Sequence, residues 1–323
     1  MNQQKIEELK KRTQQKYDFY EKLRNEKNED VVVLLRDPTI FAYAMLKDEE
    51  ENPLKLYYYQ DLIINDKKSH VQFCAGRQVG KTTLLCVKAL HHALTVKNAT
   101  VLIVSRSEPQ AIFVLDKIKE MMMRSDISFK ELIGEVENRM ELHLMPFEKS
   151  VSKIICLPAT ERGRGYSATL LLLDEIAYWE GANKDEDSSN LYRKIYEPTI
   201  SATKQWKHNY LKMGQIMVCS TPNGQQGIFW EMWNDQRFSH FHFNWLAKPG
   251  RTLEEYEALK NSMPLLVFES EYAAEFVSSA GGFITQEEYE RSEKNYMLML
   301  PKEQILYLGG DFAGEDTKTR DTD

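Results

Sequence analysis

The sequence predicts an α/β fold in which a mostly parallel sheet has helices on both faces. Short apolar segments without polar alternation recur along the chain, as expected for strands that are buried on both sides. Segments with apolar residues at helical spacing separate them, which is the pattern of parallel strands joined by helical crossovers. The apolar segments are residues 71–74, 101–104, 170–173 and 216–219, and further strands are expected at 139–145 and 151–157. Helices are expected at 83–90, 108–123 and 227–235.

The composition indicates a soluble globular protein. Of 323 residues, 42% are hydrophobic and 28% are charged, and no stretch approaches the ~18 consecutive apolar residues of a membrane span. The first residues lack the apolar core of a secretory signal, and the four dispersed cysteines show neither zinc spacing nor a disulfide framework, which favours a reducing cytoplasm. The net charge of −7 argues against broad wrapping by nucleic acid. Any DNA contact must therefore come from a local basic surface or from several subunits together.

A phosphate-binding loop is the most specific motif of the chain. Backbone N–H groups of such a loop, lying between a strand and a helix, bind a polyphosphate. In ATP binding, Lys81 would reach the β- and γ-phosphates, and the Thr82 hydroxyl would ligate Mg²⁺. Ala75 replaces the usual first glycine, which alters the loop if that position needs a positive φ. The candidate ATP-binding residues are Ala75, Gly76, Arg77, Gln78, Val79, Gly80, Lys81, Thr82 and Thr83.

Two carboxylates follow the apolar segment 170–173 farther along the chain. Asp174 and Glu175 would lie at the carboxyl edge of the sheet, where ligands of open α/β sheets bind. We expect Asp174 to hold the Mg²⁺ shell and Glu175 to accept a proton from the attacking water. With the loop, this pair predicts a P-loop NTPase of the RecA/ASCE-like class that uses ATP and Mg²⁺.

Further candidate residues adjoin these motifs. Ser220 and Thr221 end the segment 216–219, where they would lie beside the γ-phosphate and sense its loss. Tyr59 and Gln60 precede the strand of the loop. Gln60 could read an adenine edge while a tyrosine packs on the ring.

The chain divides into four predicted parts. Residues 1–36 form a charged helix whose apolar stripe packs on the domain that follows. The P-loop ATPase domain spans 37–280 and begins with a helix that Asp37 caps. A linker follows at 281–303. Residues 304–323 form an apolar strand that ends in Asp311, as at the opening of a further domain.

These motifs resemble those of the large terminase subunit of tailed bacteriophages, the ATP-driven motor that packages DNA into a procapsid. The resemblance covers most of residues 36–312. Arg77 and Gln78 inside the loop are typical of the variant Walker A motif of that family. The other matching residues are Asp37, Pro38, Phe41, Tyr59, Gln60, Gly76, residues 79–83, 162–165, 173–175 and 220–224.

The resemblance implies roles for two arginines. In the family, an arginine at the position of Arg77 contacts phosphates and links the nucleotide state to subdomain movement. An arginine ahead of the Walker B aspartate reaches a neighbouring subunit's nucleotide in some members. Arg164 has that spacing here, and Arg162 is its close competitor. The implied catalytic set is therefore Glu175, Lys81, Arg77 and Arg164.

The resemblance also implies a nuclease domain and several partners. A ribonuclease-H-like nuclease follows the ATPase in the family, and Asp311 matches its first metal-binding aspartate. Two-metal cleavage needs several carboxylates, and the others do not follow before Asp323, so we expect a truncated nuclease that cannot cleave DNA. Expected partners are double-stranded DNA, the portal protein, the small terminase subunit and further copies of the chain in a ring, with a monomer in isolation. The expected location is the host cytoplasm, with transient docking on the procapsid and no membrane.

Two alternative functions remain open. A helicase of the Asp-Glu-motif type shares the loop, the acidic pair and the Ser-Thr segment. It needs a second ATPase-like domain, however, and no second strand–helix series follows Thr221. A non-catalytic scaffold that binds ATP as a switch would have no use for a base at Glu175.

Overall fold

The described part of the chain is built on eight strands that form one sheet. In this computed structural model the described residues are 3–26, 35–125, 129–160, 163, 165–179, 188–201 and 214–277. The strands are β1 (His70–Ala75), β2 (Thr100–Ser105), β3 (Ile133–Glu137), β4 (Glu141–Phe147), β5 (Ser150–Pro158), β6 (Leu170–Asp174), β7 (Gln215–Ser220) and β8 (Phe238–Phe243).

The sheet is mostly parallel, as the sequence predicts. Its strand order is β3-β4-β5-β2-β6-β7-β1-β8. The pairs from β5 through β8 along that order are parallel, whereas β3, β4 and β5 pair antiparallel at one edge. β7 lies between the strand of the phosphate-binding loop, β1, and the strand of the acidic pair, β6. The carboxyl ends of these three strands therefore lie side by side.

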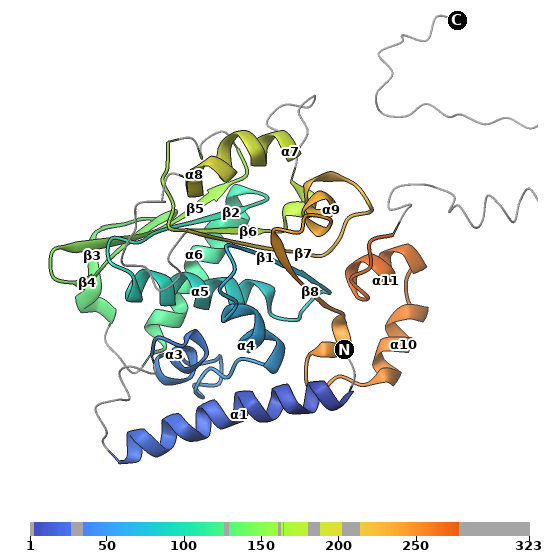
Figure 1. Cartoon of the computed structure of the whole chain (residues 1–323), viewed down its shortest axis with the longest axis horizontal. Coiled ribbons are helices and arrows are strands. Elements are labelled where there is room, and N and C mark those ends of the chain that lie inside the picture. The colour runs from blue at the N-terminus through green and yellow to red at the C-terminus, as the bar shows by residue number, and fades with distance from the viewer. Residues whose placement is uncertain are drawn as a thin grey trace, which may run out of the picture. The chain divides into compact units, whose positions relative to one another are not determined.

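Helices lie on both sides of the sheet (Figure 1). They are α1 (Gln3–Asn25), α3 (Pro38–Met45), α4 (Tyr58–Ile64), α5 (Lys81–Thr95), α6 (Glu108–Met123), α7 (Ser188–Leu191), α8 (Glu197–Ser201), α9 (Gly227–Trp233), α10 (Leu253–Asn261) and α11 (Leu265–Glu271). Short turns of 3₁₀ or π helix lie at Phe129–Leu132, Ile176–Tyr178, Tyr192–Tyr196 and Trp245–Ala247.

The central strands bury side chains on both faces. On β2, Val101 and Ile103 belong to the apolar core that also contains residues of α3 to α6. Leu102 and Val104 belong to the opposite core, which contains residues of α9. This double burial explains why the strands are continuously apolar instead of alternating.

Local sequence signals account for several element boundaries. The side chain of Asp37 accepts hydrogen bonds from the N–H groups of Thr39 and Ile40, and Pro38 occupies the first turn of α3, as expected. α6 begins at Glu108 and ends at Met123, the predicted bounds. The strand expected at 139–145 begins later, at Glu141, and β3 was not predicted because its segment, 133–137, is short and half exposed.

The described residues belong to one unit, Met1–Gly282. In it, α1 packs against α3 and α4, and no helix of the described residues is long and apolar enough to cross a membrane. The predicted linker at 281–303 and the strand at 304–323, with Asp311, lie outside the described residues.

Candidate nucleotide-binding site

The phosphate-binding loop connects β1 directly to α5. Gly80 has φ of 83° and is followed at once by Lys81, the first residue of α5, so the helix N-terminus faces the loop. Gln78 also has a positive φ, 59°, which is uncommon for a residue with a side chain. A positive-φ turn that leads directly into a helix N-terminus is the arrangement that presents backbone N–H groups to an anion.

Two loop positions favour glycine for different reasons. A Cβ on Gly76 would lie 2.6 Å from the backbone carbonyl oxygen of Tyr272, just after α11, and the φ of 83° at Gly80 is one that a residue with a side chain rarely adopts. Ala75 is tolerated because it remains in the β1 ladder, paired with Phe243, and has no positive φ. Replacing the usual first glycine therefore leaves the loop without strain at that position.

Lys81 and Glu175 lie side by side in the wall of a cavity of about 720 Å³. Lys81 Nζ lies 3.6 Å from Oε1 of Glu175 and also donates to the carbonyl oxygens of Ala75 and Gly76, at 3.1 and 3.2 Å. The cavity is lined by Arg77, Gln78, Gly80, Lys81, Thr82 and Thr83 from the loop and helix, and by Glu175 and Thr221. The loop and both neighbouring strand ends thus meet at one site.

Asp174, the last residue of β6, is buried next to Glu175 and does not line the cavity itself. It is 1% exposed; Oδ1 accepts from Cys219 Sγ at 3.3 Å and Oδ2 from Gln110 Nε2 at 3.3 Å. Burial, together with the adjacent charge of Glu175, raises the pKa of Asp174 to about 6.

The donor set fits a magnesium ion. Thr82 lines the cavity, and Asp174 at the end of β6 supplies a buried carboxylate next to Glu175. A hydroxyl and a carboxylate are the hard oxygen ligands that Mg²⁺ prefers, with waters and phosphates filling its other positions.

Glu175 is fixed by the neighbouring strand. It adopts φ of 51°, and its N–H donates to the carbonyl oxygen of Cys219 at 2.8 Å. Ser220 Oγ donates to Oε2 of Glu175 at 3.3 Å. Ser220 is fully buried and holds Glu175, whereas Thr221 lines the cavity.

A hydrogen-bonded chain links Thr221 to the phosphate-binding loop. The Thr221 hydroxyl donates to the Tyr178 hydroxyl at 3.2 Å, and Tyr178 donates to Oε1 of Glu271 at 3.1 Å. Oε2 of Glu271 in turn accepts from Arg77 Nε at 2.6 Å. Hydrogen bonds from Arg77 and Tyr178 and the charge of Arg77 outweigh burial, which alone would raise the pKa of Glu271, and keep that pKa below its ordinary value.

Tyr59 and Gln60 of α4 form hydrogen bonds to the backbone of the phosphate-binding loop. Tyr59 is fully buried, and its hydroxyl donates to the carbonyl oxygen of Val79 at 2.8 Å, so its ring is not a surface for a base. Gln60 Nε2 donates to the carbonyl oxygen of Gly80 at 3.3 Å, and Oε1 accepts from the N–H of Tyr57 at 2.9 Å. A second cavity, about 520 Å³, adjoins Gln60 and is lined by Tyr57 and Tyr43.

Several residues of the site were missed by sequence reasoning. Arg251 stacks on Trp245, with 4.0 Å between the guanidinium carbon and the ring centroid, and donates to the carbonyl oxygen of Gln78 at 3.0 Å. Arg106, Gln110, Lys117, Lys248 and Glu271 also line the main cavity. They come from segments without a recognisable motif, although Arg106 and Gln110 follow a predicted strand end, which was a usable signal. The candidates Arg162 and Arg164 lie outside the described residues.

Comparison with known families identifies a match. A family model described as the ATPase domain of the phage terminase large subunit gpA matches residues 56–244. This range contains the loop, the acidic pair and the Ser-Thr segment. A comparison with curated proteins finds no match.

Solved structures with the same fold include phage terminases. The ATPase domain of the large terminase from Thermus phage P74-26 is 22% identical, with a TM-score of 0.56, and the match covers 71% of this chain and 96% of that one. The large terminase of bacteriophage HK97 is 17% identical, with a TM-score of 0.58, covering 75% of this chain and 55% of that one. The large terminase of a thermophilic bacteriophage in complex with ADP is 11% identical, with a TM-score of 0.50, covering 68% of this chain and 53% of that one. At these identities the likeness establishes the fold.

Proposed function

The chain belongs to the phage terminase large-subunit family, and we propose that it hydrolyses ATP in the described cavity to drive double-stranded DNA into a procapsid. The observation that carries this proposal is the placement of Lys81 and Glu175, 3.6 Å apart, on one cavity at the end of the sheet. The Lys81 ammonium group suits the phosphate charge, and the Glu175 carboxylate suits the attacking water.

The residues divide the chemistry between them. The loop N–H groups and Lys81 bind the phosphates and stabilise the charge that develops during transfer. Glu175, held by Ser220, orients the attacking water and accepts its proton. Thr82 and Asp174 would hold Mg²⁺, which neutralises phosphate oxygens when bound. The second cavity, beside Tyr57 and Gln60, would hold the base.

Partners and the trans-acting arginine are part of the same proposal. The chain would act as a ring of copies docked on the portal protein in the host cytoplasm, with the small terminase subunit supplying DNA. Arg164, or Arg162, would reach the neighbouring copy's nucleotide, which makes the ring more active than the monomer. The segment that ends in Asp311 would open a ribonuclease-H-like nuclease domain.

Steady-state ATP hydrolysis tests the proposal against its alternatives. The protein is assayed with Mg²⁺, with and without double-stranded DNA, beside a strand-unwinding assay. Turnover without unwinding supports the packaging ATPase. Unwinding would favour the helicase, and ATP binding without any turnover would favour the switch.

A further inference from the structure

Helix α4 lies between the N-terminal helix α1 and the phosphate-binding loop. On one side, Asp61 of α4 faces α1. On the other, Tyr59 and Gln60, the two residues before it, hold the loop carbonyl oxygens of Val79 and Gly80. Adjacent residues of α4 therefore contact both α1 and the phosphate-binding loop.

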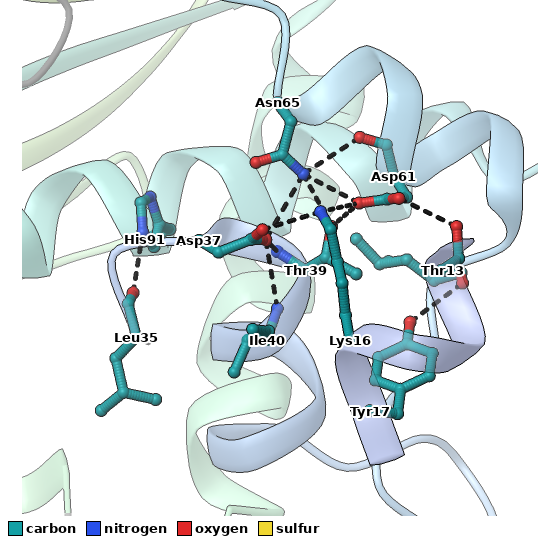
Figure 2. Close-up of polar contacts among 11 residues, drawn as sticks. Thr13, Lys16, Tyr17, Leu35, Asp37, Thr39, Ile40, Asp61, Asn65 and His91 are labelled. Carbon is teal, nitrogen blue, oxygen red and sulfur yellow. Dashed lines mark hydrogen bonds and ion pairs between the residues drawn. The ribbon is translucent and has the colours of Figure 1, made fainter. Parts of the chain in front are cut away.

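The contact with α1 is a partly buried polar cluster around Asp61 (Figure 2). Lys16 Nζ lies 2.6 Å from Oδ1 of Asp61 and 2.7 Å from Oδ2 of Asp37. Thr13 Oγ1 donates to Oδ2 of Asp61 at 2.8 Å, and Thr39 Oγ1 donates to Oδ1 at 2.6 Å. Lys16 thus joins α1 to α4 and to the start of α3.

A second contact fixes the entrance to α4. The Tyr17 hydroxyl donates to the carbonyl oxygen of Leu56 at 3.0 Å, and the Tyr17 ring lies 4.7 Å from that of Tyr43. Leu56 directly precedes Tyr57, whose N–H is held by Gln60. Helix α1 therefore positions both the start and the middle of α4.

The charge at the cluster is stabilised by α1. Burial alone would raise the pKa of Asp61, but hydrogen bonds from Lys16, Thr39 and Thr13 and the charge of Lys16 outweigh it and lower that pKa. Removing one partner of a buried ion pair leaves the other charge uncompensated. Loss of Lys16 would therefore move or loosen α4 as well as α1.

Movement of α4 reaches the loop through two side chains. The Gln60 amide lies against Gly80 and donates to its carbonyl oxygen at 3.3 Å, and the Tyr59 hydroxyl donates to the carbonyl oxygen of Val79 at 2.8 Å. Gly80 lies immediately before Lys81, so a shift of α4 changes the position of the N–H groups and the lysine that bind phosphate.

We propose that Lys16 of α1 is a positioning residue of the nucleotide site, acting through Asp61 and Gln60 to set the geometry of the phosphate-binding loop. α1 lies outside the segment 56–244 that matches the family model. The inference rests on the nucleotide binding and hydrolysis proposed above. It implies that a partner that displaced α1 would change ATP affinity from a distance.

A double-mutant cycle in the full chain tests this coupling. Lys16→Ala, Gln60→Ala and the double variant are compared for KM and kcat of ATP hydrolysis and for the Kd of ATPγS. Lys16→Ala should raise KM and Kd roughly 3- to 10-fold with a smaller effect on kcat, and it should add little once Gln60 is absent. Lys16→Arg should restore most of the affinity.

Two further variants separate positioning from general stability. Lys11→Ala removes an exposed lysine from the same helix and should leave KM, Kd and the melting temperature unchanged. Thr13→Val removes a single hydrogen bond to Asp61 and tests the coupling if Lys16→Ala folds poorly.

The outcomes are distinguishable. A lower melting temperature with unchanged KM and Kd, or fully additive effects of Lys16→Ala and Gln60→Ala, would show that Lys16 only stabilises the fold. If the wild-type chain binds ATPγS without hydrolysing ATP, the proposed function fails, and a non-additive effect on Kd still supports the positioning role.

Discussion

Arg77 in the phosphate-binding loop donates its Nε–H to Oε2 of Glu271 at 2.6 Å, across 194 positions of sequence. The Arg77 N–H also donates to the Glu271 carbonyl oxygen, at 2.7 Å. Glu271 is the last residue of α11, and through Tyr178 it also reaches Thr221. The Glu271 carboxylate therefore links three segments of the site, which are the loop, the segment after the acidic pair and the end of β7.

Glu271→Gln should lower kcat because Arg77 and Tyr178 both lose their charged partner. A catalytic arrangement that shifts by about 1 Å can lose up to roughly 100-fold in rate, and we expect a loss of roughly 10-fold or more. Steady-state ATP hydrolysis measures it, with Glu269→Gln, two residues earlier in α11, as the matched control. Equal rates for wild type and Glu271→Gln would mean that the link has no part in turnover.

Glu175→Gln separates binding from chemistry. Glutamine keeps the shape and the hydrogen bond to Ser220 but cannot take the proton of the attacking water. The variant should lose ~10²–10⁴-fold in kcat while its Kd for ATPγS stays close to that of the wild type. A parallel loss of nucleotide affinity would assign Glu175 a structural role instead.

Asp174→Asn should stabilise the folded protein at neutral pH while removing its activity. The pKa of Asp174 is raised from 3.8 to about 6 in the folded state, so folding favours the protonated form. Stability from this group is fully present below pH 3.8 and is lost as the pH rises through 6. The gain in stability of Asp174→Asn should therefore be largest above pH 6 and shrink as the pH falls toward 4.

Urea unfolding of both proteins between pH 4.5 and 8 measures this difference. Asp116→Asn, at an exposed position of α6, serves as the control. A constant difference across the pH range, or a less stable Asp174→Asn at pH 8, would contradict a pKa of Asp174 that burial raises.

The fold and the centre of the site follow from local sequence. The double burial of β2, β6 and β7 makes these strands continuously apolar, and the loop from Gly76 to Thr82 has few other structural uses, so both were predicted. The short strand β3 was missed because its residues alternate between partly buried and exposed positions without a strong apolar signal.

The rest of the site depends on tertiary packing. Glu271 and Arg251 reach the loop from segments far along the chain, and no local pattern marks either residue. The sequence suggested that Gln60 could read an adenine edge, whereas in the structure its amide contacts Gly80 and Tyr57, and Tyr59 is buried under Val79. The sequence placed these two residues ahead of the loop strand but did not predict the direction in which they point from α4.

Mixing inactive subunits tests the trans-acting arginine. Arg164→Ala subunits keep Lys81 and Glu175, and Glu175→Gln subunits keep Arg164. If Arg164 acts on a neighbour's nucleotide, the mixture assembled on portal or DNA should recover part of the activity, since such arginines add ~10³–10⁵ in rate. Recovery only with Arg162→Ala subunits would assign the role to Arg162, and no recovery with either would favour Arg77 acting within its own subunit.

Steady-state ATP hydrolysis by the wild type and by Lys81→Ala, with Lys260→Ala at an exposed position of α10 as the control, tests the central assignment most directly. Lys81 lies 3.6 Å from Glu175 at the start of α5, where it would meet the charge that develops on the phosphates. We expect slow Mg²⁺-dependent turnover by the wild type and by Lys260→Ala, and none by Lys81→Ala. Turnover by Lys81→Ala at the wild-type rate would contradict the assignment of this cavity as the ATPase site.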